Sequence, residues 1–166
     1  MSGTIEIERK FLVTGDGWRG GAGERMAQGY LAATPASSVR VRLAGPRAWL
    51  TVKSGGSGRV RREFEYAIPP TDAQAMLALC PDASVEKIRY RIAYAGRTWE
   101  VDAFLGANAG LVVAEIELEA PEAEVVLPDW VGIEVTDDPR YLNANLAVHP
   151  WRDWVEARLD RNPAGR

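Results

Sequence analysis

The segment from Ile5 to Val13 reads Ile-Glu-Ile-Glu-Arg-Lys-Phe-Leu-Val, with a charged residue at every second position and apolar residues in most of the gaps. Because successive side chains of a β-strand point to opposite faces, this alternation predicts a strand with one charged face and one apolar face. The same spacing returns in five later segments: Arg40 and Arg42, Glu63 and Glu65, Lys87 to Arg91, Glu100 and Asp102, and Glu115 and Glu117. The repetition indicates a sheet with one ionic face.

Parity assigns eight acids and seven bases to this ionic face. They are Glu6, Glu8, Glu63, Glu65, Glu100, Asp102, Glu115 and Glu117, and Lys10, Arg40, Arg42, Lys53, Lys87, Arg89 and Arg91. On an open sheet they would form solvent-facing cross-strand pairs that each add little stability. In a closed sheet they would line a wet, ionic interior. The closed sheet is favoured because acids and bases segregate by strand and the opposite faces are aliphatic. Only the helices are expected to cover those faces.

Eight strands are predicted from the alternation and from the turn signals between them. They span 5–13, 26–32, 38–43, 48–53, 60–68, 85–94, 97–104 and 111–119, with Gly45-Pro46 and Ala95-Gly96 as tight turns. The glycine-rich segment 15–23 predicts a mobile surface loop, and helices are expected over 71–79, 139–147 and 150–160. The elements together predict an α+β fold: an eight-stranded antiparallel β-barrel, a tunnel with a charged lumen, flanked by a few helices including a C-terminal helix.

The expected C-terminal helix carries an aromatic stripe. Trp151, Trp154, Val155, Arg158 and Leu159 recur at helical spacing, which predicts that this face docks on the barrel. Plain core packing explains the stripe; the alternative is that the helix also closes one mouth of the tunnel and limits the length of the substrate.

Size and composition bound the classes of function. A chain of 166 residues is expected to form a single domain over 1–166, and no apolar run approaches the ~20 residues of a membrane helix. No secretory signal is evident, so a cytoplasmic location is expected. The net charge of −3 argues against broad nucleic-acid binding. The single cysteine, Cys80, and the single histidine, His149, are interpreted as structural.

The residue types of the ionic face are those that bind divalent metals and phosphate groups. Clustered carboxylates without His or Cys ligands suit hard cations such as Mg²⁺ or Mn²⁺, which prefer oxygen. Clustered Arg and Lys side chains suit phosphate oxygens. Together they predict a phosphoryl-transfer site in which basic residues hold a linear polyphosphate and a metal offsets the developing charge.

The ordered series of motifs resembles the CYTH superfamily, the triphosphate tunnel metalloenzymes. The motif Glu6-x-Glu8-x-Lys10 near the N-terminus resembles the signature of that superfamily. The resemblance continues through Gly29-Tyr30-Leu31, Val39-Arg40-Val41-Arg42, Thr51-Val52-Lys53, Arg62-Glu63-Phe64-Glu65, Lys87-x-Arg89-Tyr90, Trp99-Glu100-Val101-Asp102, Ala114-Glu115-Ile116-Glu117 and Gly132-x-Glu134-Val135-Thr136.

The resemblance implies roles for individual residues. Metal ligands for Mg²⁺ or Mn²⁺ would be Glu6, Glu8, Asp102, Glu115 and Glu117. Contacts to the triphosphate would come from Lys10, Arg40, Arg42, Lys53, Lys87 and Arg89, with Arg91 completing the set. Lys10 and Lys87 would also assist either the attack of water or the departure of the leaving group, and these two roles stay open. Glu63 and Glu65 join the catalytic group as residues that orient the others, as Glu100 does.

The resemblance to the compact bacterial-type members implies metal-dependent hydrolysis of inorganic triphosphate to pyrophosphate and phosphate. Thiamine triphosphatases and class IV adenylyl cyclases share the signature, so hydrolysis or cyclisation of an organic triphosphate is the first alternative. The second is a noncatalytic polyphosphate or nucleotide sensor. The expected partner is a small-molecule triphosphate, with no nucleic acid and no membrane, and a homodimer is the favoured assembly.

Overall fold

The computed structural model describes residues 3–54, 60–80 and 82–154, and its main element is one antiparallel sheet. The strands are β1 (Thr4–Val13), β2 (Glu24–Ala33), β3 (Ser37–Ala44), β4 (Arg47–Ser54), β5 (Val60–Ala67), β6 (Ser84–Tyr94), β7 (Arg97–Phe104), β8 (Val112–Glu117) and β9 (Val131–Glu134). The helices are α1 (Pro70–Leu77) and α2 (Asn143–Val148), with 3-10 turns η1 (Gly106–Asn108) and η2 (Pro139–Tyr141). Residues 151–154 are also helical.

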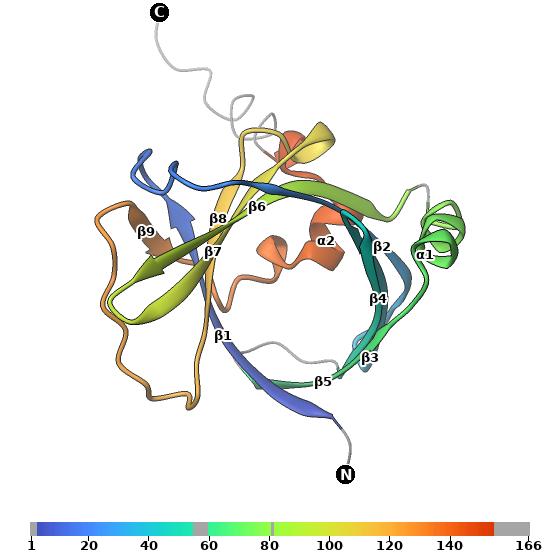
Figure 1. Cartoon of the computed structure of the whole chain (residues 1–166), viewed down its shortest axis with the longest axis horizontal. Helices are drawn as coiled ribbons and strands as arrows, with labels where there is room; N and C mark the ends of the chain where they lie inside the picture. Colours follow the sequence, from blue (N-terminus) through green and yellow to red (C-terminus); the bar gives the residue numbers. More distant parts are fainter. Residues whose placement is uncertain (1–2, 55–59, 81, 155–166) are drawn as a thin grey trace, which may run out of the picture.

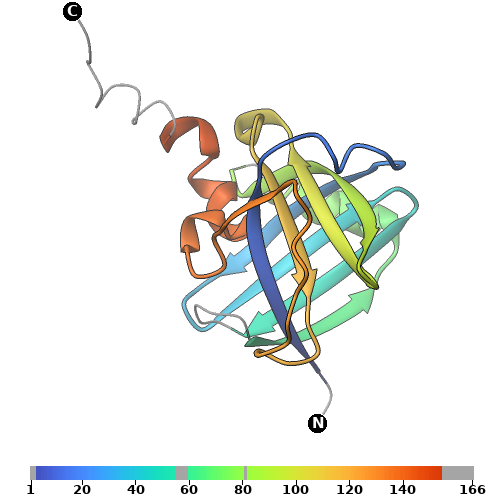
Figure 2. The same cartoon turned by 90° about the vertical axis from the view of Figure 1, so that its left-hand side faces the viewer.

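The sheet closes on itself. Its strand order is β5-β4-β3-β2-β6-β7-β8-β1-β9, and an additional pairing between β5 and the first half of β1 completes an eight-stranded barrel. Figure 1 looks into the ring of strands, and Figure 2 shows the strands crossing the barrel obliquely. The predicted eight-stranded antiparallel barrel is therefore confirmed. The Ala95-Gly96 hairpin is also as expected, with positive φ at both residues.

The apolar faces point outward, and loops as well as helices cover them. One core cluster joins Phe11, Trp99 and Ile116 of the barrel to Trp18 and Trp130, which lie in the connections outside it. The prediction that only helices supply this cover was wrong. The glycine-rich segment 15–23 lies on the surface as expected, with every residue but Trp18 exposed, and it is held to the barrel by Trp18, which is buried in this cluster.

Helix α1 covers a different part of the outer face. Its buried Ala73 packs with Val41 of β3 and Ala48 of β4. The helix was predicted over 71–79, and Pro70 in its first turn sets the beginning, since proline is tolerated where no intrahelical N–H bond is required.

One end of the lumen is filled by apolar side chains. Leu12, Val85, Phe104 and Val113 follow the same parity as the charged residues, yet they form a cluster with Tyr141 and with Leu146 of α2. Helix α2 therefore closes this end: it lies across the ring in Figure 1 and at one end of the barrel in Figure 2. The expected helix over 139–147 is η2 followed by α2.

The C-terminal aromatic residues pack outside this plug. Trp151 and Trp154 contact Tyr141, with ring centroids 6.4 and 5.2 Å away. The docking of the stripe is confirmed for these two residues, while Val155, Arg158 and Leu159 lie outside the described residues. Closure of the tunnel belongs to α2, not to the described part of this helix.

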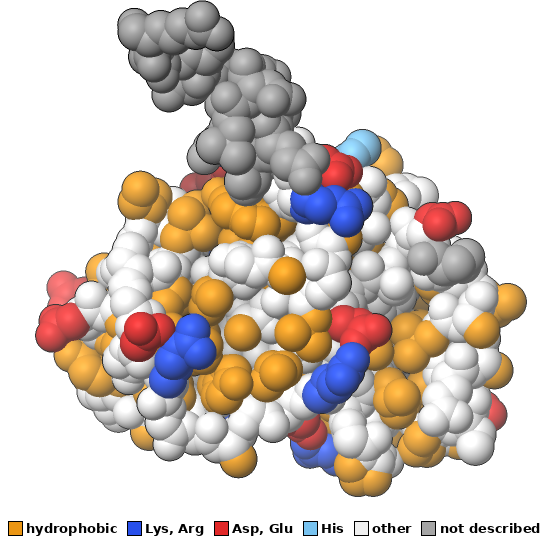
Figure 3. Space-filling model, turned by 90° about the horizontal axis from the view of Figure 1, so that it is seen from above, with side chains coloured by type: hydrophobic (Ala, Val, Ile, Leu, Met, Phe, Trp, Pro, Cys, Tyr) orange, Lys and Arg blue, Asp and Glu red, His pale blue; other side chains and the backbone are white. Residues whose placement is uncertain are grey.

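The outer face seen from above in Figure 3 carries few charged side chains. From above (Figure 3), hydrophobic side chains spread over the outer face between isolated pairs of opposite charge. Among the described residues, no helix is both long enough and apolar enough to cross a membrane.

Candidate active site

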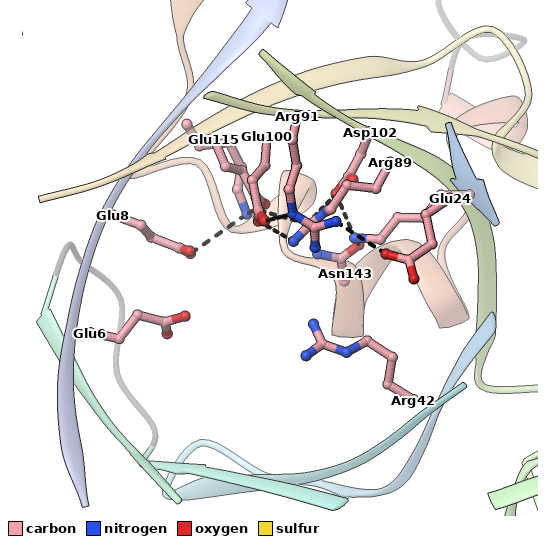
Figure 4. A network of polar contacts seen from close by, with 12 residues as sticks. Glu6, Glu8, Glu24, Arg42, Arg89, Arg91, Glu100, Asp102, Glu115 and Asn143 are labelled. Carbon is pink, nitrogen blue, oxygen red and sulfur yellow. Dashed lines mark hydrogen bonds and ion pairs between the residues drawn. The ribbon is translucent and has the colours of Figure 1, made fainter. Parts of the chain in front are cut away.

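The barrel encloses a cavity of about 1070 Å³ that is lined by charge. Of the residues that parity assigned to the ionic face, all but Asp102 line it; they come from β1, β3, β4, β5, β6, β7 and β8. Figure 4 shows Glu6 and Glu8 pointing from β1 into this space, with Arg42 and the group around Arg89 on other sides. The predicted ionic interior is therefore present.

The wall made by β3, β4 and β5 holds alternating ion pairs. Lys53 Nζ lies 2.6 Å from a Glu6 oxygen and 3.7 Å from Glu63. Glu65 accepts from Arg42 at 3.1 Å and from the buried Thr51 hydroxyl at 3.0 Å. Arg42 also lies over the ring of Trp49, 5.0 Å from its centroid. The structure thus places Glu63 and Glu65 beside the bases, where they can orient them.

The opposite wall is made by β6, β7 and β8, and Arg89 is its centre. The guanidinium bonds both oxygens of Asp102 at 2.7 Å, contacts Glu115 at 3.1 Å and pairs with Glu100. Glu100 in turn accepts from Arg91 at 3.1 Å. A planar fork shared among several carboxylates fixes the orientation of Arg89 strongly.

Asp102 lies behind this wall rather than on its surface. The residue is fully buried, and its oxygens bond Lys87 Nζ at 2.5 Å and the guanidinium of Arg89. An ionised carboxylate in such a place is held by its two cations; without it Lys87 would lose the carboxylate that it pairs with, and Arg89 would keep only Glu100 and Glu115. The structure therefore groups Asp102 with Lys87 and Arg89, not with the carboxylates exposed to the lumen.

The two candidate catalytic lysines have opposite electrostatic environments. Both are almost fully buried, at 4% exposure for Lys10 and 2% for Lys87. Burial lowers the pKa of Lys87 to about 8, the attraction of Asp102 notwithstanding, and nearby Arg89 adds to the lowering. Burial also opposes the charge of Lys10, but Glu115, 2.9 Å away, and Glu8 outweigh it and raise the pKa of Lys10. Lys10 is thus a fixed cation, whereas Lys87 can exchange a proton near neutral pH.

The carboxylates of Glu6, Glu8 and Glu117 face the open lumen. Burial and the charges of Glu6, Glu100 and Glu8 raise the pKa of Glu117, whose side chain makes no ion pair or hydrogen bond within the described residues. A cation placed among these oxygens would relieve the repulsion, so an oxygen-binding divalent metal fits the residues present. No three such side chains of the described chain are already assembled as a metal site, because Glu6 is bonded to Lys53 and Glu8 to Arg61.

Comparison with known proteins agrees with the barrel and its lining. The family model described as the CYTH domain matches residues 4–146, which is most of the chain. The chain belongs to the CYTH family. Its resemblance to that family, first found in the motifs, is confirmed.

Curated relatives of this CYTH domain carry a consistent name. An inorganic triphosphatase from Acetivibrio thermocellus is 48% identical over 153 residues, covering 91% of this chain and 98% of the relative. An inorganic triphosphatase from Nitrosomonas europaea is 38% identical over 150 residues, covering 86% and 97%. A solved structure described as the inorganic triphosphatase NE1496 is similar with a TM-score of 0.65 and 34% identity, covering 86% of this chain and 94% of that one.

The lumen of this CYTH domain also holds residues that the sequence prediction missed. Arg61 contacts Glu8 at 3.0 Å, and its spacing of two residues from Glu63 could have revealed it. Asn143, at the start of α2, accepts from Lys87 at 3.4 Å, and only the folded arrangement brings them together. Glu24 of β2 does not line the cavity itself but bonds the lining residue Arg91 at 3.1 Å, and it also bonds Arg47 at 2.7 Å. Glu24 gave no periodic signal because Met26 and Gln28, which follow it on the same face of β2, carry no charge.

Proposed function

We propose that this protein hydrolyses inorganic triphosphate to pyrophosphate and phosphate in the lumen, with Mg²⁺ or Mn²⁺ as its metal. The observation that carries the proposal is the two-signed lining, in which carboxylates and a similar number of Arg and Lys side chains share one cavity. The named relatives support the substrate, and the all-oxygen donor set of Glu6, Glu8 and Glu117 supports the choice of metals.

Binding would exchange the partners of existing ion pairs. Glu6 and Glu8, which pair with Lys53 and Arg61 in the structure, would hold the metal, and Lys53 and Arg61 would then be available to the phosphate oxygens. An exchange of this kind leaves few buried charges unpaired at any stage, and that limits the electrostatic cost of binding. When bound, the metal would neutralise part of the charge that develops on the phosphoryl oxygens.

Lys10 and Lys87 would then have different roles in the hydrolysis. A water molecule attacks a terminal phosphorus atom and the bond to the bridging oxygen breaks, so that pyrophosphate leaves. Neutral Lys87 accepts the proton of the attacking water, since its pKa of about 8 is suited to proton transfer. Lys10, which remains an ammonium, stabilises negative charge on the phosphates together with Arg40 and Arg42. Asp102 keeps Lys87 and Arg89 in place, and Glu63 and Glu65 orient the bases opposite.

A pH profile tests the assignment of Lys87. Below pH 8 this residue is an ammonium and cannot accept a proton, so kcat/KM should rise with pH and level off above an inflection near 8. The bound anionic substrate favours the ammonium, and the inflection in kcat should therefore lie at higher pH. Lys87→Arg keeps the charge but cannot act as a base, and its residual activity should lose this inflection. An unchanged profile in Lys87→Arg contradicts the role.

The substrate is tested by comparing kcat/KM for inorganic triphosphate, thiamine triphosphate and ATP, with Mg²⁺ or Mn²⁺ and with identification of the products. Helix α2 closes one end of the lumen, so an organic group would have to extend through the other end. We expect a preference for inorganic triphosphate of at least about 10-fold, a ratio that binding contacts alone can supply. A preference for an organic triphosphate would move the assignment to that substrate. Tight binding of any of the three without turnover would indicate a noncatalytic polyphosphate or nucleotide sensor.

We expect a single domain over 1–166, a cytoplasmic location, a homodimer, and neither nucleic acid nor membrane as a partner.

A further inference from the structure

Lys10 lies where β1 changes its neighbour in the barrel. On one edge β1 pairs with β8, and Lys10 is opposite Glu115. On the other edge β1 pairs with β5 only from Thr4 to Ile7, and with β9 only from Phe11 onward. The Lys10 peptide therefore falls in the gap between two ladders, where a strand would lack regular hydrogen-bond partners.

The segment after β9 supplies the missing partners. The Lys10 backbone N–H donates to the Thr136 hydroxyl oxygen at 3.0 Å, and the Val135 N–H donates to the Lys10 carbonyl at 2.8 Å. The Thr136 hydroxyl in turn donates to a Glu134 oxygen at 2.7 Å. The Arg9 guanidinium donates two hydrogen bonds to the same Glu134 carboxylate, at 3.0 and 2.6 Å. The hydroxyl is thus oriented with its oxygen toward Lys10.

Packing of β9 alone does not require this hydroxyl. The strand has its own pairings with β1, Phe11 with Glu134 and Val13 with Val131. The hydroxyl of Thr136 instead bonds the backbone of Lys10, whose ammonium is buried against Glu115 at 2.9 Å. Because that side chain is packed, a shift of the Lys10 peptide would move the ammonium in the lumen.

We propose that Thr136 is a positioning residue for Lys10, and that Glu134 and Arg9 orient its hydroxyl. The inference rests on the proposed function, in which Lys10 stabilises the phosphates. Thr136 contacts neither substrate nor metal in this account; it acts through the backbone of Lys10.

A double-mutant cycle tests the proposal by measuring kcat, KM and the urea midpoint of Thr136→Val, Lys10→Ala and the double variant. Thr136→Val should lower kcat/KM by about 10- to 100-fold, the range expected when a reacting geometry is displaced by about 1 Å. Thr136→Ser keeps the hydroxyl and should stay near the parent protein. In the Lys10→Ala background, Thr136→Val should cause almost no further loss.

A matched control is Trp18→Phe, which removes a hydrogen bond from the outer core, away from the lumen. It should lower the urea midpoint without changing kcat/KM. Equal losses from Thr136→Val in both backgrounds, or no loss in either, would overturn the positioning role. Full turnover by Lys10→Ala would overturn the proposed role of Lys10 first, and the two failures are thus distinguishable. If Thr136→Val yields no folded protein, Glu134→Gln replaces it in the same cycle with the same expected pattern.

Discussion

Replacing Asp102 by Asn is expected to lower the free energy of unfolding by about 3 to 5 kcal/mol, the usual cost of removing one partner of a buried ion pair. Asp102 is fully buried and neutralises Lys87 and Arg89 at 2.5 and 2.7 Å. The variant would leave positive charge uncompensated behind the lumen wall. Urea denaturation in EDTA measures the effect, and activity should fall with it because Lys87 and Arg89 lose their fixed positions.

The matched control is Asp16→Asn. Asp16 also pairs with an arginine, Arg19 at 2.6 Å, but both side chains are exposed. A pair of this kind contributes less than about 1 kcal/mol, so the control should unfold almost as the parent protein does. EDTA makes the comparison decisive, because an aspartate that only held a metal would leave the metal-free protein unchanged on substitution. Equal stability of the parent protein and Asp102→Asn in EDTA would contradict a structural role of Asp102 in holding Lys87 and Arg89.

Replacing Glu117 by Gln is expected to separate stability from activity. The pKa of Glu117 is raised by burial and by Glu6, Glu100 and Glu8, so the unmodified side chain repels its neighbours in the metal-free protein. The variant should therefore be as stable as the parent protein or more so in EDTA. Its activity should fall at least about 100-fold, because even groups behind a metal's ligands often cost 10- to 100-fold when lost.

Glu86→Gln is the control for this second change. Glu86 lies on the outer face of β6, exposed, and pairs with Arg25 at 2.6 Å. The same substitution there should change neither stability in EDTA nor turnover appreciably. Glu117→Gln with full activity would remove Glu117 from the metal site, and a large loss of stability would show that its charge has a structural partner.

Much of the site could be predicted because a strand has a period of two. Once Glu6, Glu8 and Lys10 share a face, closing the barrel brings that face inward together with the bases of the other strands. The apolar end of the lumen obeys the same rule, since Leu12 follows Lys10 and Val113 precedes Glu115 at the same spacing. That signal was available in the sequence and predicts a plug.

Other features depend on contacts that periodicity does not encode. The stagger between β6 and β7 sets Asp102 opposite Arg89 and within reach of Lys87. Strand β9 was missed because it has only four residues. The bond between Lys10 and Thr136 joins residues 126 positions apart. Alternation fixes the face of each side chain, whereas the partner on that face follows from strand register and from the segments that fill the ends of the barrel.

The most direct test of the account is phosphate release from inorganic triphosphate by the purified protein, measured with EDTA and then after adding back Mg²⁺ or Mn²⁺. We expect no release in EDTA and rapid release after metal is restored, with pyrophosphate as the second product in equal amount. Turnover that persists in EDTA, or no turnover with either metal, would contradict a metal-dependent triphosphatase in this lumen.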